Sequence, residues 1–212
     1  MKINEKGRSM IEMLGVLAII AVLTVGGIAG YSKAMHKYKM NKSIQQITDI
    51  VFNIRSLFAN ERDYKGVNSI FLKNPDLISE GMVIDSDMPV LRNALNHVIA
   101  VYSGGGYSLR DEGDYGSFAI YIHDINNKRE CVELVTRDWG TVSSGLVFVA
   151  VVNNPSGDID IIEGDVYLGC HGGKQGQSVI ACAGGDIIPT PMPLHIAAEA
   201  CTDKSEIAIK FY

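Results

Sequence analysis

The sequence contains residue types used in several kinds of catalysis, but their spacing matches none of these chemistries. Its five histidines are scattered along the chain: His36, His97, His123, His171 and His195. A hydrolase needs a nucleophile beside a base, and the Gly-x-Ser-x-Gly turn does not occur. The glycine runs at 104–106 and 172–173 lack the lysine spacing of a phosphate-binding loop, so we interpret them as turns. We therefore predict that the protein is not an enzyme and has no cofactor.

Cysteine chemistry is a second possibility. The four cysteines are Cys131, Cys170, Cys182 and Cys201. All of them follow an apolar segment at residues 13–31, and if this segment delivers them across a membrane, their even number favours disulfides. Four cysteines allow three pairings. The alternatives are buried free thiols and a zinc site that includes His171 and His195, but no C-x-x-C or H-x-x-x-H spacing supports zinc.

An acidic cluster provides a candidate calcium site. Its members are Asp158, Asp160, Glu163 and Asp165. Calcium prefers oxygen ligands, and Asp158 and Asp160, two positions apart, would share one face of an extended strand. Since a solvated acidic face is the favoured interpretation of such a cluster, we assign no metal to it.

Composition and charge divide the chain into two parts. Of its 212 residues, 47% are hydrophobic, and the mean hydropathy of +0.12 is raised by residues 13–31, which carry no charged side chain. No second run reaches the roughly 20 apolar residues of a bilayer span, which excludes a transporter with several spans. Residues 1–60 hold eight Lys or Arg against three acids, whereas residues 61–212 hold 11 against 21. This acidic part does not favour nucleic-acid binding, which needs a basic patch.

A carboxylate lies at the edge of the apolar segment. Glu12 stands within a stretch of Met, Ile and Leu residues, and a charged group deep in a bilayer is costly unless it has a partner. The apolar run is longer than the core of a signal peptide, and no A-x-A cleavage pattern follows Gly30, so we expect the segment to be retained. The alternative is that Glu12 lies in the headgroup region.

The N-terminal residues resemble those of a type IV prepilin. Residues 1–7 are similar to its short basic leader, residues 7–14 (GRSMIEML) to the junction that prepilin peptidase cuts, and residues 15–23 to its apolar helix. The resemblance implies cleavage between Gly7 and Arg8, N-methylation of Arg8, and a glutamate at the fifth mature position, which is Glu12. Arg8 departs from the pattern, because the family usually begins with Phe, Met or another apolar residue. Cleavage would free an amine on Arg8 that pairs with Glu12 of a neighbouring subunit, which makes Glu12 an assembly residue.

A long helix is predicted after the leader. Apolar residues recur at three- and four-residue steps through residues 34–58 and no proline interrupts them, so one helix is expected from residue 9 to about residue 60. Its apolar half, residues 8–31, is expected to span the membrane, and its amphipathic half, residues 32–60, to pack on a head. Four lysines between residues 33 and 42 conflict with the positive-inside rule. The cysteines and the leader place residues 32 onward outside the cell membrane.

The predicted extracytoplasmic head comprises residues 61–212. A connecting loop at 61–95 is followed by a short helix at 127–137 and by strands at 98–102, 117–122, 146–152, 159–168 and 207–211. This order predicts an α+β fold, a long N-terminal helix packed on an antiparallel sheet. It resembles the PilS-like group of type IVb pilins. The resemblance implies a disulfide between Cys131 on the short helix and Cys201 before the last strand, which leaves Cys170 to pair with Cys182.

Together these features predict a structural subunit of a type IV pilus. The precursor is expected in the inner membrane, as a single-pass protein with its head outside, and the mature subunit in an extracellular pilus. Its expected partners are other pilin subunits, prepilin peptidase and the pilus assembly platform of the inner membrane. A type II secretion pseudopilin, which shares the N-terminus, is one alternative. A single-span anchored extracytoplasmic binding protein is an alternative of another class.

Overall fold

A computed structural model describes most of the chain. The described residues are 10–68, 74, 77–84, 91–103, 115–153, 165–170 and 190–212. The chain divides into two compact units, Met1–Asn41 and Lys42–Tyr212. The boundary between the units lies inside a helix, so the last part of that helix belongs to the head.

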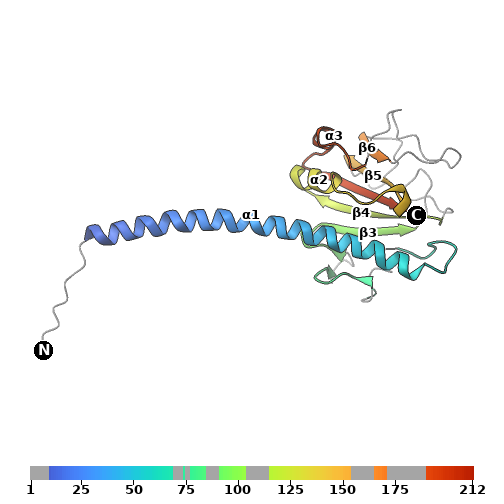
Figure 1. The fold of residues 1–212 in the computed structure, drawn as a ribbon, viewed down its shortest axis with the longest axis horizontal. Coiled ribbons are helices and arrows are strands. Elements are labelled where there is room, and N and C mark those ends of the chain that lie inside the picture. The colour runs from blue at the N-terminus through green and yellow to red at the C-terminus, as the bar shows by residue number, and fades with distance from the viewer. Residues whose placement is uncertain are drawn as a thin grey trace. The chain divides into compact units, whose positions relative to one another are not determined.

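The helix α1 comprises Met10–Leu57, 48 residues without a proline (Figure 1). In the head unit its residues Ile47, Ile50 and Ile54 are completely buried, at the three- and four-residue steps that place side chains on one face. The buried polar residues of this face also have partners, because a buried amide or hydroxyl without a hydrogen bond is costly. The Gln46 side chain donates to the Glu80 carbonyl and accepts from the Ala94 amide, and the Ser43 hydroxyl accepts from the Leu95 amide.

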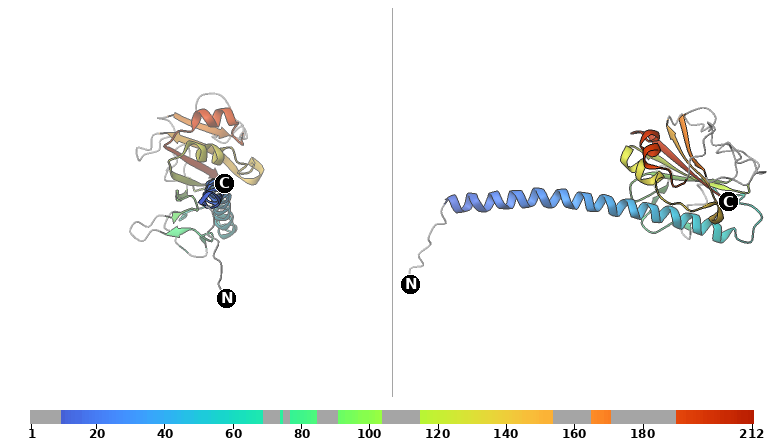
Figure 2. Two further views of the ribbon diagram at one scale, coloured as in Figure 1. Left: turned by 90° about the vertical axis from the view of Figure 1, so that its left-hand side faces the viewer. Right: turned by 45° about the horizontal axis from the view of Figure 1, so that its top comes forward.

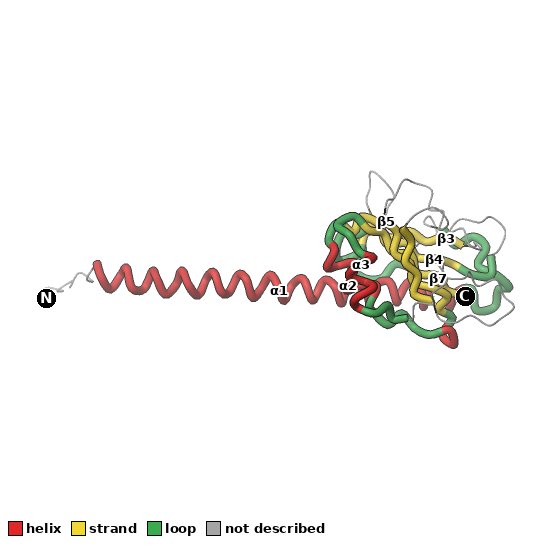
Figure 3. The backbone as a smooth tube through the Cα atoms, turned by 90° about the horizontal axis from the view of Figure 1, so that it is seen from above, coloured by secondary structure: helices red, strands yellow, loops and turns green. Residues whose placement is uncertain are grey.

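The head contains a seven-stranded sheet in the order β1-β2-β3-β4-β7-β5-β6, with every neighbouring pair antiparallel (Figure 3). The strands are β1 (Val83–Ile84), β2 (Leu91–Arg92), β3 (Val98–Ser103), β4 (Phe118–Ile125), β5 (Leu146–Asn153), β6 (Asp165–Cys170) and β7 (Ser205–Phe211). The predicted α+β fold, a long helix and an antiparallel sheet, is confirmed. Four predicted strands match β3, β4, β5 and β7 closely, whereas the fifth prediction, 159–168, overlaps β6 only from Asp165.

The two faces of the sheet carry different side chains. One face carries branched residues that are aligned across four strands, such as Val101, Ile120 and Ile209. The other face is lined by small and aromatic residues, among them Ala100, Ala119, Tyr121, Phe148, Ala150 and Ala208, all buried. A period of two along each strand produces this separation. The branched face continues into Phe211, above whose ring the guanidinium of Arg55 on α1 lies at 5.0 Å.

Two short helices and a 3-10 turn complete the head: α2 (Lys128–Val135), η3 (Val142–Ser144) and α3 (Leu194–Ala200). The N-cap of α2 is Asn127, whose side chain accepts from the Arg129 amide. The structure contains a disulfide between Cys131 on α2 and Cys201 at the end of α3, the pairing that the resemblance implied. The bond therefore joins the two helices immediately before β7 begins.

Candidate assembly site

The N-terminal part of α1 is an apolar surface that its own chain leaves uncovered. Large apolar side chains are exposed along the whole of residues 10–31, from Met10 (85% exposed) to Tyr31 (67% exposed). Among the described residues, α1 is the one helix long and apolar enough to cross a membrane, and none of its most apolar 18-residue window is buried. Exposed apolar surface of this extent marks a membrane or protein interface.

Glu12 lies in the first turn of α1 and is exposed. An acid in this turn is favourable because the amide groups of a helix start carry partial positive charge. No described residue forms an ion pair with Glu12. Residues 7–9 lie outside the described residues, so the predicted cleavage site at Gly7 and Arg8 has no structural account here. The partner for Glu12 therefore remains a prediction.

The glycines of the apolar segment are not required by contacts within the chain. A Cβ atom placed on Gly15, Gly26, Gly27 or Gly30 would meet nothing within 4 Å. Each glycine weakens a helix by about 1 kcal/mol relative to alanine, so these four residues lower helix stability without a packing reason inside the monomer. Close approach of another helix is the packing reason that small residues in apolar helices usually have.

The other predicted site residues are only partly described. Cys182 lies outside the described residues and Cys170 ends β6, so the Cys170–Cys182 pairing stays a prediction. Of the candidate calcium ligands, Asp158, Asp160 and Glu163 also lie outside the described residues. Asp165 begins β6.

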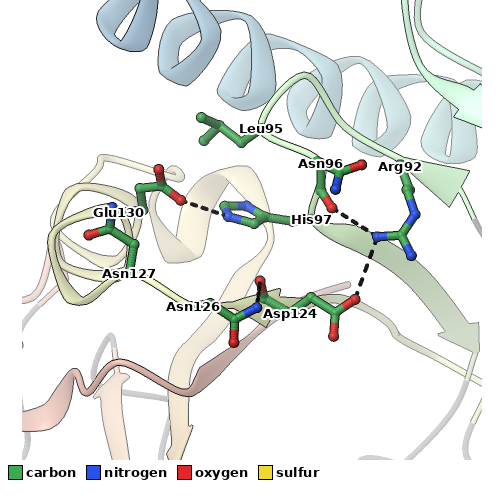
Figure 4. A pocket seen from close by; sticks show the side chains of 8 residues that line it. All are labelled: Arg92, Leu95, Asn96, His97, Asp124, Asn126, Asn127 and Glu130. Carbon is green, nitrogen blue, oxygen red and sulfur yellow. Dashed lines mark hydrogen bonds and ion pairs between the residues drawn. The ribbon is translucent and has the colours of Figure 1, made fainter. Parts of the chain in front are cut away.

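The structure shows a polar cavity that the sequence did not indicate (Figure 4). It has a volume of about 440 Å³ and lies between the turn before β3, the end of β4 and the start of α2. Its central contact joins His97 and Glu130, whose Nε2 and Oε2 atoms are 2.9 Å apart. Arg92 lies at its other side, where it donates to the Asn96 carbonyl at 2.9 Å and lies 3.5 Å from the Asp124 carboxylate.

The environment of His97 favours a neutral imidazole. The side chain is 3% exposed, and this burial lowers its pKa below the usual 6.5, although the hydrogen bond to Glu130 and the charges of Glu130 and Asp124 oppose the shift. A neutral imidazole donates its Nε2–H to the Glu130 carboxylate. Its Nδ1 atom makes no hydrogen bond with a described residue. The contact ties the turn before β3 to α2.

The chain has a long exposed apolar helix that continues into an α+β head, and a disulfide precedes the last strand of that head. This is the architecture of a type IV pilin. No family model matches the chain. The chain is 27% identical over 142 residues to the major structural subunit of bundle-forming pilus from Escherichia coli O127:H6 (strain E2348/69 / EPEC), which covers 66% of this chain and 69% of that protein. The subunit of the same description from Escherichia coli O111:H- matches with the same identity and coverage. These similarities confirm the resemblance to type IVb pilins and support a pilin subunit of a type IV pilus.

Proposed function

We propose that this protein is a structural pilin that is cut between Gly7 and Arg8 by prepilin peptidase and polymerised through the apolar part of α1. The observation that carries the proposal is the exposed apolar surface of residues 10–31 on a chain homologous to a pilus major subunit. A subunit of this kind acts by assembly and not by catalysis. Besides other pilin subunits and the peptidase, the protein binds the assembly platform of the inner membrane. The precursor is anchored in this membrane before the subunit enters the extracellular pilus.

The exposed apolar surface of residues 10–31 must be covered both in the precursor and in the filament. Covering one Leu, Ile, Val or Met side chain contributes about 1.5–3 kcal/mol relative to water. In the precursor, lipid covers the side chains of residues 10–31. In the filament, the same side chains are covered by the helices of neighbouring subunits. Because lipid and protein interior are similarly apolar, the choice between them depends on packing and on polar contacts.

Glu12 is the polar contact that selects the assembled state. Cleavage creates a new amino group on Arg8, and this cation of one subunit meets the Glu12 carboxylate of the next. A charged pair enclosed by apolar helices is costly to break, because removal of one member leaves the other buried and unpaired. The pair therefore sets the axial register of neighbouring subunits. The four glycines of the segment allow the close approach of helices that such a contact requires.

The first test is the intact mass and N-terminal sequence of the protein from cells with and without a prepilin peptidase. We expect a chain that begins at Arg8 only when the peptidase is present, and its mass also reports methylation of the new amino group. A chain that keeps Met1 in both strains would remove the pilin proposal and favour a single-span anchored protein. Electron microscopy of the surface filaments separates a pilus from the short fibres of a pseudopilin.

The second test is substitution of Glu12. We expect Glu12→Ala to lower the filament yield by at least about tenfold, since an uncompensated buried amine costs more than about 1.4 kcal/mol. Glu61→Ala is the matched control, because Glu61 is an exposed acid beyond the end of α1. Equal yields from the two variants would show that Glu12 has no assembly role, while the filament itself could still form.

A further inference from the structure

A ring of cationic and aromatic side chains surrounds α1 directly after its apolar segment. Lys33, Lys37 and Lys39 are exposed, as are Tyr31 (67% exposed) and Tyr38 (62% exposed). Each side chain combines an apolar stem or ring with a polar tip, and such side chains are enriched where a helix leaves a bilayer. No described residue forms an ion pair with the three lysines. The part of the chain that the structure describes therefore offers these charges no counter-ion.

The lysine–tyrosine ring does not lie on one face of the helix. Through this region α1 continues without a break (Figure 2). Lys33 and Lys37 are four residues apart and share one face, whereas Lys39 lies about 200° further round than Lys37. Tyr31 and Tyr38 are seven residues apart and share a third face. A protein that docks on one face of α1 reaches only part of the ring, whereas a layer that encircles the helix contacts all of it.

The length of the apolar segment places the ring at a membrane surface. Residues 10–31 extend about 33 Å at 1.5 Å per residue, and the hydrocarbon core of a bilayer is about 30 Å thick. The eight residues that end at Lys39 rise about 12 Å further, and the headgroup layer adds about 5–8 Å to the core. Helix side chains lean toward the N-terminus of their helix, which in α1 is the direction of the membrane. The ammonium groups of Lys37 and Lys39 therefore lie nearer to the headgroups than their Cα atoms do.

We infer that Lys33, Lys37 and Lys39 bind the phosphate groups of anionic phospholipids around the membrane-anchored precursor. This inference rests on the proposed pilin function, which requires a precursor in the membrane, and it adds a lipid partner to that function. The potential of an anionic membrane surface attracts each nearby lysine by about fivefold in binding. The apolar segment supplies insertion, and the lysines select the charge of the surrounding lipid.

The lipid contact affects the step from membrane to filament. A subunit that leaves the bilayer must exchange these headgroups for groups of neighbouring subunits or for water. The contact therefore holds the precursor at a fixed depth and adds to the free energy of its release. Assembly removes the subunit from both of its lipid contacts, the one along the apolar segment and the one at the ring.

The test measures the lipid selectivity of the full chain in phosphatidylcholine vesicles. Electron paramagnetic resonance compares how strongly spin-labelled phosphatidylglycerol and spin-labelled phosphatidylcholine associate with the protein. We expect the unmodified chain to prefer phosphatidylglycerol. Combining Lys33→Gln, Lys37→Gln and Lys39→Gln should lower the ratio of the two association constants by at least about twofold. Glutamine has nearly the helix propensity of lysine, so α1 keeps its structure.

The matched control combines Arg62→Gln, Lys128→Gln and Lys204→Gln in one chain. These substitutions remove the same net charge from exposed positions on the head. We expect this variant to keep the lipid selectivity of the unmodified chain, because its charges lie outside the ring.

Two further measurements separate the charge of the ring from its structure. Arginine at all three lysine positions, 33, 37 and 39, keeps the charges and should keep the preference for phosphatidylglycerol. Raising the salt concentration to about 0.5 M should weaken the preference, because salt screens exposed charges. A preference that the arginine variant loses would mean that the charges do not produce it, which would overturn the inference.

The outcomes distinguish the inference from the proposed function. An unchanged selectivity in the glutamine variant would overturn the lipid contact and leave the pilin function intact. An equal loss in the head control would also overturn it, because net charge alone would then explain the selectivity. A glutamine variant that keeps its lipid selectivity but forms fewer filaments would assign the lysines to neighbouring subunits instead of lipid. Failure of the unmodified chain to float with vesicles in a density gradient would remove the membrane-anchored precursor, and with it the proposed function.

Discussion

The disulfide between Cys131 and Cys201 supports a quantitative prediction. It closes a loop with a sequence separation of 70 residues, and both cysteines are completely buried. In the chain-entropy model a loop of this length corresponds to about 4.4 kcal/mol of stability. For a chain of this size, about 1 kcal/mol shifts the thermal midpoint by about 2–4 °C, so loss of the bond corresponds to roughly 9–18 °C.

We would compare the Cys131→Ala, Cys201→Ala and double variants with the unmodified chain. The free energy of unfolding of each detergent-solubilised protein is measured by urea and thermal unfolding. Either single substitution already removes the whole cross-link. We therefore expect each single variant to lose about 4.4 kcal/mol and the double variant to lose little more. Chemical reduction of the unmodified chain should give at least this loss, because it also opens the predicted bond between Cys170 and Cys182.

The comparison among these variants can refute the reasoning. A loss below about 1 kcal/mol in the double variant would mean that the unfolded chain is not restricted by this bond. A double variant much less stable than either single variant would show that the lost sulfur packing, and not loop closure, dominates. The unmodified chain in oxidising buffer gives the reference value.

Three further predictions concern the head. His97 has a pKa lowered by burial, so the unfolded chain takes up its proton first as the pH falls below 6.5. The contribution of neutral His97 to the free energy of unfolding is therefore fully present above pH 6.5. It decreases by about 1.4 kcal/mol per pH unit as the pH falls from 6.5 to the pKa of His97 in the folded chain. His97→Gln should remove this dependence, which urea midpoints at about pH 7 and about pH 5 measure. Gly145→Ala should destabilise far more than Gly66→Ala. Both glycines have positive φ, but only the Cβ at 145 would meet Arg55 and, at 3.1 Å, the Tyr212 carbonyl, and thermal midpoints of the two variants report the difference. Asn127→Ala should cost about 1 kcal/mol of unfolding free energy because α2 loses its cap, and a thermal midpoint unchanged within error would contradict this role.

The sequence predicted the elements whose pattern is local. The helix α1 was recognised from its apolar period and lack of proline, and four strands from their apolar runs and flanking turns. The helix α3 was missed because its usual starting signal is absent. Its N-cap is Pro193, and no side chain caps it. A seven-residue helix without a cap residue gives too little periodicity to be recognised.

Sequence reasoning reached only the part of the candidate site that lies in one segment. Glu12 stood out because an acid is rare in an apolar run. His97 and Glu130 are 33 residues apart and belong to no motif, so only the register of β3 against β4 brings them together. The same holds for the cavity that Phe52 of α1 and Trp139 of the loop after α2 both line, which forms only through the packing of α1 on the head. Residues joined by tertiary structure alone leave no signal in a single sequence.

The position of β7 in the sheet affects the order in which the head can form. The strand lies between β4 and β5, and its partners on both sides precede it in the sequence. Until β7 has been synthesised, the pairs β3–β4 and β5–β6 lack the strand that joins them, and their inner edges are unpaired. Such edges are prone to pair with other chains, and pairings this distant in sequence form slowly. The two halves of the sheet therefore join only when this last strand, seven residues long, is available.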